Sequence, residues 1–334
     1  MLDGAFAVLV IVVLLGVAFD FINGFHDTAN AIATSVSTRA LKPEHAILMS
    51  ATANFIGALS GTAVAVTIAS GLAETPEGPA GQVIVAAALV GAIIWNLLTW
   101  RLGIPSSSSH ALIGGLLGAT IIAEGVDAVI WSGVRDKVLV PLVLSPVLGV
   151  AIGFAFMVVV LNVFRRAHPA RINSRFRRLQ VGSAAYMAFS HGSNDAQKTM
   201  GIMTLALFTA GVIPSVEVPL WVILLSATAI SLGTAAGGWR IIKTMGQKVV
   251  KLDPVHGFAA ETTAASIILG ASHFGMPVST THVISSAIIG VGSSIRLSAV
   301  RWGVAGNIVV AWILTLPASG LAAALAWLVL SRFL

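Results

Sequence analysis

The sequence predicts an all-α polytopic membrane protein with two inverted-topology repeats, whose broken or re-entrant helices meet at a midplane site. Of the 334 residues, 57% are hydrophobic and only 10% are charged, a composition far from that of soluble domains. Two polar patterns also occur twice, because residues 23–30 have a degenerate partner at 191–198 and residues 105–110 return at 277–282. Polar motifs duplicated at membrane depth are typical of secondary transporters whose site lies between two repeats.

The expected elements follow from apolar runs of about 20 residues, the length that spans a bilayer. Such runs occur at residues 4–22, 44–72, 80–102, 138–164, 219–238 and 303–330. Between them lie interrupted segments rich in Gly, Ser, Thr and Asn, which contain every repeated motif: 24–41, 104–124, 179–213 and 254–295. Polar interruptions at matching places in two halves predict broken or re-entrant helices. We therefore expect a first repeat at 1–164 and a second at 179–334.

The cationic charge is concentrated in residues 165–178, which hold six Arg and no acid and so equal the net charge of +6. An Arg cluster beside membrane spans is typical of a cytoplasmic loop, which makes nucleic-acid binding unnecessary as an explanation and lipid head-group binding a second interpretation. No basic residue precedes Arg39, which argues against a cleaved signal peptide. We expect a multi-pass protein of the plasma (inner) membrane with its N-terminus outside.

The loops also indicate that the two halves are inverted. Arg39 and Lys42 follow the first Asp motif, whereas Glu217 follows its partner. Two further pairs of corresponding loops exchange acidic for basic character in the same way. The positive-inside rule predicts this exchange for repeats of opposite orientation, since a parallel duplication keeps the signs.

Five charged residues fall inside the predicted membrane segments: Asp20, Asp27, Asp195, Glu261 and Lys198. A charge at the bilayer centre costs roughly 3 kcal/mol or more, so such residues usually face a cavity and mark an ion or substrate path. A structural role as a helix cap or an ion pair, for instance Asp195 with Lys198, is the alternative. That alternative has most weight for Asp20, which lies outside the repeated motifs.

The repeated Asp motifs carry oxygen ligands at helical spacing. Asp27 and Asn30 stand at i and i+3, which places a carboxylate and an amide on one helix face, and the carboxylate–amide combination returns as Asn194 and Asp195. Hard oxygen ligands suit Na⁺, and an unpaired buried carboxylate takes up a proton instead. The motifs thus predict a cation site.

The repeated Ser/Thr motifs follow a Pro and precede a helix. Hydroxyls and free backbone N–H groups at a helix N-terminus favour a tetrahedral oxyanion, although each copy alone is also an ordinary N-cap. Two copies in inverted halves would bring two such helix ends to one point, which makes anion binding the better interpretation. The motif histidines His26, His110, His191 and His282 receive no role, and interhelical hydrogen bonds are expected of Asn54, Asn96 and Asn307.

These motifs resemble those of the PiT inorganic phosphate transporters, in particular the bacterial low-affinity type. Residues 24–31 resemble the first family signature and residues 190–198 the second, bacterial form. Residues 94–96 with 105–110, and 257–258 with Glu261 and 277–282, resemble further family blocks. The resemblance runs from about residue 20 to 295.

The resemblance implies inverted repeats with re-entrant hairpins and symport of inorganic phosphate with Na⁺ or H⁺. It implies coupling-cation residues at Asp27, Asn30, Asn194, Asp195 and Glu261, with Na⁺ as a candidate ligand of the first four. It implies phosphate-binding residues at Ser107, Ser108, Ser109, Ser279, Thr280 and Thr281, assisted by Asp195 and Lys198. The chain departs from the symmetric signature at Lys198, which stands where the first copy has Asn30, and at His26, which replaces an Asn. The Lys198 ammonium group would replace a bound Na⁺ or pair with phosphate, which favours H⁺ coupling.

Several alternatives share part of this evidence. A sulfate symporter of the same family would keep the fold; the site carboxylates favour phosphate, which still carries a proton at neutral pH, whereas sulfate has none. An intramembrane Ser/His/Asp hydrolase lacks support because the motifs are duplicated and Gly-x-Ser-Gly is absent. A channel would be recognised by larger currents. We expect no enzyme and no organic cofactor, and a homo-oligomer is left open.

Overall fold

The computed structural model describes residues 4–333, which form helices joined by short turns. The first half comprises α1 (Gly4–Ser37), α2 (Pro43–Ala58), α3 (Ala63–Ser70), α4 (Pro79–Leu102), α5 (Ser108–Glu124), η1 (Val126–Ala128), α6 (Trp131–Val134), η2 (Arg135–Leu139) and α7 (Val140–Val163). The second half comprises α8 (Pro169–Thr209), α9 (Leu220–Ala236), α10 (Trp239–Lys243), η3 (Thr244–Lys248), α11 (Pro254–His273), α12 (Thr280–Ile295), η4 (Leu297–Ala299) and α13 (Trp302–Leu330).

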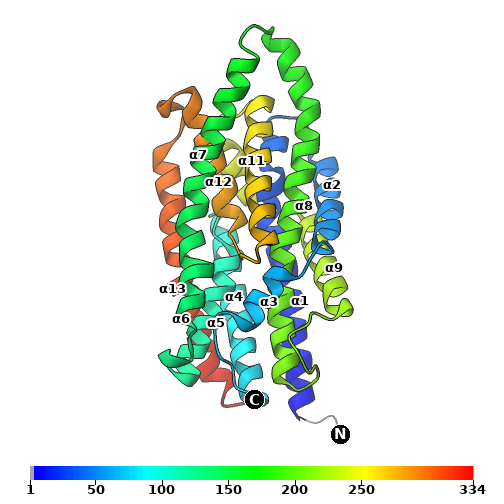
Figure 1. The fold of residues 1–334 in the computed structure, drawn as a ribbon, viewed down its shortest axis with the longest axis vertical. Coiled ribbons are helices and arrows are strands. Elements are labelled where there is room, and N and C mark those ends of the chain that lie inside the picture. Colours follow the sequence, from blue (N-terminus) through cyan, green and yellow to red (C-terminus); the bar gives the residue numbers. More distant parts are fainter. Residues whose placement is uncertain (1–3, 334) are drawn as a thin grey trace.

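The two halves run in opposite directions through the molecule (Figure 1). Helix α1 leaves the end that holds both termini, whereas α8 starts at the opposite end, beside the α7–α8 connection. The hairpin of α4 and α5 occupies one half of the long axis, and the hairpin of α11 and α12 occupies the other. Their tips meet near the middle, as predicted for inverted-topology repeats with re-entrant helices.

The duplication extends to individual hydrogen bonds in the hairpin turns. Gly103 and Gly275 adopt positive φ angles of 68° and 65°, which only glycine adopts without strain. In the first turn the Ile104 N–H donates to the Thr99 carbonyl at 2.9 Å, and in the second the Met276 N–H donates to the Ala271 carbonyl at 2.9 Å. The two hairpins are therefore built on the same backbone plan.

Helices α1 and α8 each contact the second helix of the other half through a motif glycine. A Cβ on Gly24 would lie 2.2 Å from the Ile230 carbonyl oxygen of α9, and one on Gly192 would lie 2.1 Å from the Asn54 carbonyl oxygen of α2. Small residues let membrane helices approach closely. The repeats are therefore interlocked, with the first Asp motif packed against the second half and the second against the first.

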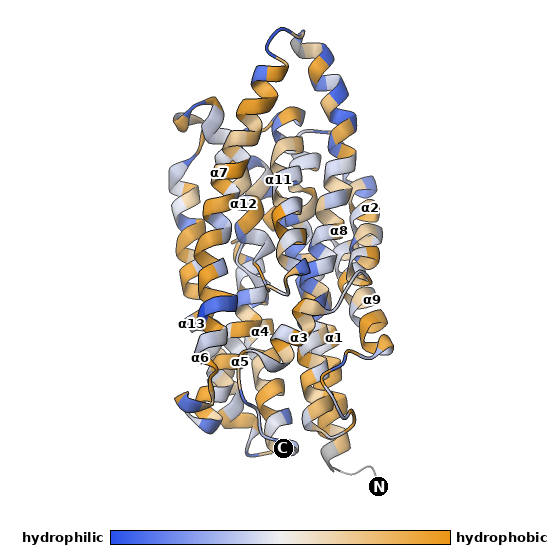
Figure 2. Ribbon diagram, viewed as in Figure 1, coloured by the Kyte–Doolittle hydropathy of each residue, from blue (hydrophilic) through white to orange (hydrophobic). Residues whose placement is uncertain are grey.

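The outer surface is that of an integral membrane protein. Four helices are long and apolar enough to cross a bilayer, or six among the described residues if the bent pairs count as one span each. The outer helices α7 and α13 are coloured mostly hydrophobic in Figure 2, while hydrophilic residues gather at the α7–α8 end and around the hairpin tips. These spans confirm the apolar runs expected from the sequence.

The positions of the helix breaks differ from the prediction. Segments 24–41 and 179–213 are not broken, because α1 continues to Ser37 and α8 to Thr209. The α4–α5 and α11–α12 turns fall at segments 104–124 and 254–295 as expected. Two further bends lie in runs predicted as simple spans, with angles of 69° between α2 and α3 and 60° between α9 and α10. The polar motif residues face other helices in the interior, so their backbone stays helical, and the second bend falls at the Gly237–Gly238 pair.

The Arg-rich segment is also mostly helical. The sequence predicts a loop over residues 165–178, but α8 begins at Pro169, and Pro is favoured in the first turn of a helix. Only the residues between α7 and α8 form the connection, and the prediction of a loop over the rest of the segment was wrong. Arg165 and Arg166 lie in the α7–α8 connection, and the other four Arg residues lie in the first turns of α8, at the end of the molecule opposite the termini.

Candidate functional site

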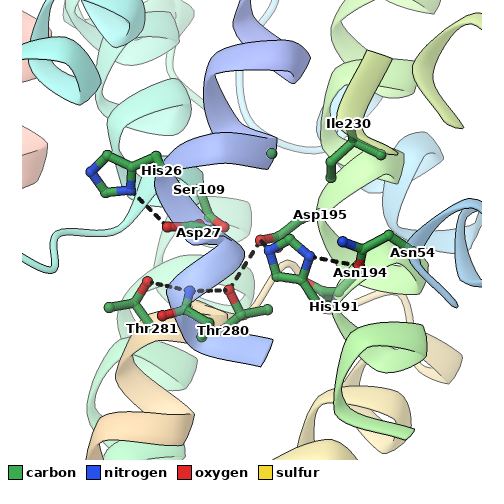
Figure 3. Close-up of polar contacts among 12 residues, drawn as sticks. His26, Asp27, Asn54, Ser109, His191, Asn194, Asp195, Ile230, Thr280 and Thr281 are labelled. Carbon is green, nitrogen blue, oxygen red and sulfur yellow. Dashed lines mark hydrogen bonds and ion pairs between the residues drawn. The ribbon is translucent and has the colours of Figure 1, made fainter. Parts of the chain in front are cut away.

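The candidate site lies where the hairpin tips meet the middle of α1 and α8 (Figure 3). Asp27 of α1, with His191 and Asp195 of α8, offers ligand atoms that lie within 4.8 Å of one another. All three side chains are buried. The structure thus brings together the two duplicated carboxylates that the sequence singles out, although they are 168 residues apart in the chain.

Asp27 is oriented by the histidine that precedes it. The His26 Nδ1 atom lies 2.7 Å from Asp27 Oδ1, and its Nε2 atom lies 3.1 Å from the Thr99 hydroxyl of α4. The Ser106 hydroxyl donates to the Thr99 hydroxyl at 2.8 Å. A chain of hydrogen bonds therefore joins the first hairpin to the Asp27 carboxylate, which gives His26 a positioning function that the sequence did not assign.

Asp195 is held by groups from both halves. One carboxylate oxygen accepts from the Thr280 hydroxyl at 3.0 Å and lies 3.0 Å from His191 Nε2, while the other pairs with the Lys198 ammonium group. The other His191 ring nitrogen lies 3.0 Å from the Asn54 side-chain oxygen of α2. The Asp195 carboxylate therefore pairs with an ammonium group of its own helix, whereas Asp27 pairs with no Lys or Arg among the described residues.

Asn30 and Lys198 occupy equivalent places in the two halves but make different bonds. The Asn30 amide donates to the Thr281 hydroxyl at 2.9 Å, at the start of α12. The Lys198 ammonium group donates to the Ser109 hydroxyl at the start of α5 and to the Val278 carbonyl at 2.9 Å. Lys198 therefore connects the two hairpin tips with Asp195, and it is buried like the rest of the group.

The hairpin tips present the starts of two helices. The Ser107 and Ser279 hydroxyls cap α5 and α12 by accepting from the His110 and His282 N–H groups at 3.1 and 3.2 Å. The Ser108 hydroxyl is buried and finds no hydrogen-bond partner in the described part of the chain. The N–H groups of a first helical turn have no intrahelical acceptor, so both tips can receive an anion.

Both motif amides have a side-chain oxygen that lacks a hydrogen-bond partner in the described chain. The side-chain oxygens of Asn30 and Asn194 are buried, and neither accepts a hydrogen bond within residues 4–333. The Asn194 NH₂ group donates to the Ser272 hydroxyl at 2.7 Å, so its orientation is determined by α11. Free amide oxygens next to two carboxylates form a ligand set for a hard cation.

Glu261 lies in a different cluster from the other residues expected to bind the cation. Its carboxylate accepts from the hydroxyls of Thr34 and Ser183, and from the Gln180 amide at 3.2 Å. These partners belong to α1 and α8, nearer the Arg-rich end than Asp27 and Asp195. Three donors satisfy the carboxylate there, and none of them belongs to the central group.

His110 and His282 do not contact the carboxylates in the way that His26 and His191 do. Their ring centroids are 4.7 Å apart, and the His282 ring stacks on Trp312 of α13 with a centroid distance of 4.1 Å. The two histidines therefore pack the hairpins together behind the tips. Sequence reasoning also missed Thr99 and Ser272, whose only signal was a hydroxyl one turn before each hairpin turn.

A cavity approaches the site from the bend between α2 and α3. It has a volume of about 390 Å³, and its lining includes Ser60, Ser193, Gln197, Ser272 and His273. Ser193 and Ser272 are the chain neighbour and the hydrogen-bond partner of Asn194. The cavity is therefore lined by two residues that adjoin the candidate ligand Asn194.

The charges of the group determine what it can bind. Two carboxylates with oxygens no more than 4.8 Å apart repel one another by about 3.5 kcal/mol or more at an effective dielectric constant of 20. Lys198 offsets only one of them, so an anion at the helix starts is repelled until Asp27 is neutralised. A proton or a metal cation near Asp27 would remove this repulsion.

Comparisons with known proteins identify the family of the chain and a solved structure of similar fold. The model of the family described as "Phosphate transporter family" matches the chain twice, over residues 23–172 and 163–323. A Bacillus subtilis protein named "Probable low-affinity inorganic phosphate transporter" is 49% identical over 96% of this chain and 97% of its own. A Pyrococcus furiosus protein named "Putative phosphate permease PF1020" is 30% identical over 95% of this chain and 94% of its own. A solved structure titled "The sodium-dependent phosphate transporter" superimposes with a TM-score of 0.89 at 28% identity, covering 98% of this chain and 100% of that one.

Proposed function

The chain belongs to the phosphate transporter family, and we propose that it is a symporter that imports inorganic phosphate with Na⁺ or H⁺ by alternating access. It is a transporter and not an enzyme, as its relatives are. One observation carries the proposal: two carboxylates from inverted halves converge within 4.8 Å beside the starts of two helices. The carboxylates favour a cation and the helix starts favour an anion. A bound cation therefore favours binding of the anion, and a bound anion favours binding of the cation.

The cation binds at Asp27, with Asn30, Asn194 and Asp195 around it. Asp27 has no ammonium partner, and the free oxygens of Asn30 and Asn194 complete a set of hard ligands. Neutralising Asp27 lowers the repulsion that opposes phosphate. Glu261 lies in a separate cluster nearer the Arg-rich end, where three donors satisfy its carboxylate, and is not part of the central ligand set.

Phosphate binds between the hairpin tips. Ser108, Ser109, Thr280 and Thr281 supply hydroxyls and first-turn N–H groups, while Ser107 and Ser279 hold those turns as caps. Lys198 attracts the anion and Asp195 accepts a hydrogen bond from its remaining proton. When the repeats rock, each hairpin in turn moves away from its contacts with α1 and α8, which opens the site first to one side and then to the other.

The coupling ion has two competing lines of support. The likeness to a sodium-dependent phosphate transporter favours Na⁺. Lys198, in the place of the neutral Asn30, favours H⁺ because a tethered ammonium group occupies one of the two cation positions. With either ion, the proposed mechanism requires a monovalent cation that neutralises Asp27.

The orientation follows from the charges at the two ends. The Arg-rich start of α8 faces the cytoplasm and the N-terminal end of α1 faces outward, in a plasma-membrane protein with repeats at 1–164 and 179–334. Measuring the accessibility of single cysteines placed in the α7–α8 connection and near the chain start tests this orientation. The chain itself contains no Cys that would interfere.

The deciding experiment is uptake of radiolabelled phosphate into proteoliposomes, with Na⁺ and proton gradients imposed separately and excess sulfate as competitor. Gradient-driven uptake that resists sulfate supports a phosphate symporter and identifies its ion. Accumulation of sulfate in place of phosphate would identify the sulfate symporter instead. Large currents without accumulation would indicate a channel.

The Asp195→Asn variant tests the site assignment. Removing this charge leaves Lys198 without its partner and should abolish coupled uptake. Asp127→Asn removes an exposed carboxylate and serves as the matched control. Unchanged uptake with unchanged ion dependence in Asp195→Asn would show that the site is placed wrongly.

A further inference from the structure

One buried carboxylate has no place in the mechanism above. Asp20 lies in the middle of α1, two turns before Asp27, and its exposed fraction is 0%. It is not a helix cap, because α1 extends from Gly4 to Ser37, and no ion pair among the described residues includes it. The two structural explanations for a buried carboxylate therefore do not apply.

The hydrogen bonds of Asp20 leave its negative charge incompletely satisfied. One oxygen accepts from the Thr199 hydroxyl of α8 at 2.7 Å, and the other, Oδ2, is buried without a partner in the described chain. The Ser226 hydroxyl of α9 is the second polar group beside the carboxylate, close enough to act as a weak donor, but it makes no hydrogen bond of good geometry within residues 4–333. Glu261, by contrast, has three donors for its two oxygens. A buried carboxylate with one donor needs a proton or a bound cation.

Asp20 also belongs to a second copy of the cation motif on the same helix. Asp20 and Asn23 stand at i and i+3, as Asp27 and Asn30 do one heptad later. The Asn23 side-chain oxygen is buried and has no partner among the residues described. Residues at i, i+3, i+7 and i+10 share one helix face, so these four form a continuous stripe of oxygen ligands.

Toward the C-terminal end of α1, the same helix face continues to Thr34, whose hydroxyl donates to Glu261. The steps from Asp20 to Asp27 and from Asp27 to Thr34 are seven residues each, or about 10 Å at the helical rise. Neither outer carboxylate is duplicated, since Ala188 stands 168 residues after Asp20 and Leu89 stands 172 before Glu261. Asp27 and Asp195 are thus equivalent residues of the two repeats. Asp20 and Glu261 have no such equivalent, and they lie on either side of Asp27 along α1.

We propose that Asp20, with Asn23, Thr199 and Ser226, is a transit site where the coupling cation, H⁺ or Na⁺, stops between the terminal end of the molecule and Asp27. This inference rests on the proposed symport. The charged groups that act on Asp20 are Asp195 and Lys198 of α8, whereas α9 offers only the Ser226 hydroxyl. A cation at Asp20 is thus drawn onward to the central carboxylates, and Lys198 prevents it from stopping at Asp195.

The test compares Asp20→Asn with Asp127→Asn, a control that removes an exposed carboxylate. The amide can still accept from Thr199, but it cannot take up a proton and, without the negative charge, it binds a metal cation more weakly. We expect the cation concentration for half-maximal uptake to rise by about tenfold or more, while the phosphate KM at saturating cation stays unchanged. Equal cation dependence in Asp20→Asn and wild type, or a parallel loss of cation and phosphate affinity, would overturn the proposal.

Two binding measurements distinguish the cations. If Asp20 holds a proton, wild type shows a carboxylic acid band in the infrared spectrum that Asp20→Asn lacks and that added Na⁺ leaves unchanged. If it holds sodium, Asp20→Asn binds one fewer radiolabelled Na⁺ per chain. If Asp20→Asn shows neither of these two changes, the proposal is overturned. Should Asp20→Asn fail to fold, Ser226→Ala removes only a hydroxyl and should shift the cation dependence in the same direction. A wild type that accumulates no phosphate would refute the symport itself, and the two binding measurements would still test Asp20.

Discussion

Lys198→Asn, which puts the residue of the first repeat in the second, tests the proposed role of Lys198 as an internal cation of the site. In the wild type the ammonium group pairs with Asp195 and bonds to both hairpin tips. Removing it leaves two carboxylates within 4.8 Å and no internal cation beside either. The variant should therefore need an additional external cation to stabilise the closed arrangement.

The size of the effect follows from the geometry. Breaking a buried ion pair by removing one partner costs about 3–5 kcal/mol, and the repulsion left between Asp27 and Asp195 is about 3.5 kcal/mol at a dielectric constant of 20. At about 2 °C per kcal/mol for a chain of this size, the midpoint of thermal unfolding should fall by about 5–10 °C. A cation present at a hundred times its Kd restores about 2.7 kcal/mol, or most of this loss.

The assay is thermal unfolding in detergent, in NaCl and in a large organic cation at equal ionic strength and at two pH values. Lys198→Asn should gain stability with Na⁺ or at lower pH, whereas wild type should respond less. Lys248→Asn, which removes an exposed lysine, is the matched control. A Lys198→Asn variant as stable as wild type without Na⁺, and insensitive to Na⁺ and pH, would refute the assignment of Lys198 as an internal cation.

Three further predictions follow from the same geometry. Asn30→Lys puts a second ammonium group beside Asp27 and should reduce gradient-driven uptake by about tenfold or more; retained coupling would contradict the cation site. Ser108→Ala removes a partnerless hydroxyl at the phosphate site and should raise the phosphate KM by about 10- to 100-fold without loss of stability, whereas the exposed Thr228→Ala should not change it. Gly24→Ala places a Cβ 2.2 Å from a carbonyl oxygen of α9 and should lower stability by about 1–3 kcal/mol in thermal unfolding; Gly182→Ala meets no atom within 4 Å, and an equal loss there would contradict the argument.

The sequence was sufficient to predict the two-repeat fold because the motifs are duplicated with their order retained. It could not locate the bends after α2 and α9, because in this fold the polar segments and the bent segments of the backbone are not the same. The motif of residues 23–30 is polar because α1 faces the other half, yet α1 remains continuous to Ser37. The run 44–72 is apolar but bends by 69° after α2. Hydropathy records the surroundings of side chains, and only tertiary packing shows where the backbone bends.

The central site was predictable in its ligands but not in its supporting contacts. Asp27 and Asp195 converge as the duplication predicts, because equivalent residues of inverted repeats approach a common axis. His26 and His191 were left without a role, since neither histidine indicates from sequence that it faces a carboxylate. Glu261 was grouped with the central acids because spacing along the chain does not reveal which layer of α1 it meets.

The differences between the halves concern side chains and leave the backbone equivalent. The first repeat has Asn23 and His26 where the second has His191 and Asn194, so the two copies exchange amide and imidazole around carboxylates at the same position. His26 reaches Thr99 of the first hairpin and Asn194 reaches Ser272 of the second, which preserves the hairpin contact with different chemistry. Equivalent backbones allow the two halves to exchange conformations at similar free energy, which alternating access requires. Under the proposed mechanism, the unequal charges, above all Lys198 opposite Asn30, make one half accept an exchangeable cation while the other retains its own.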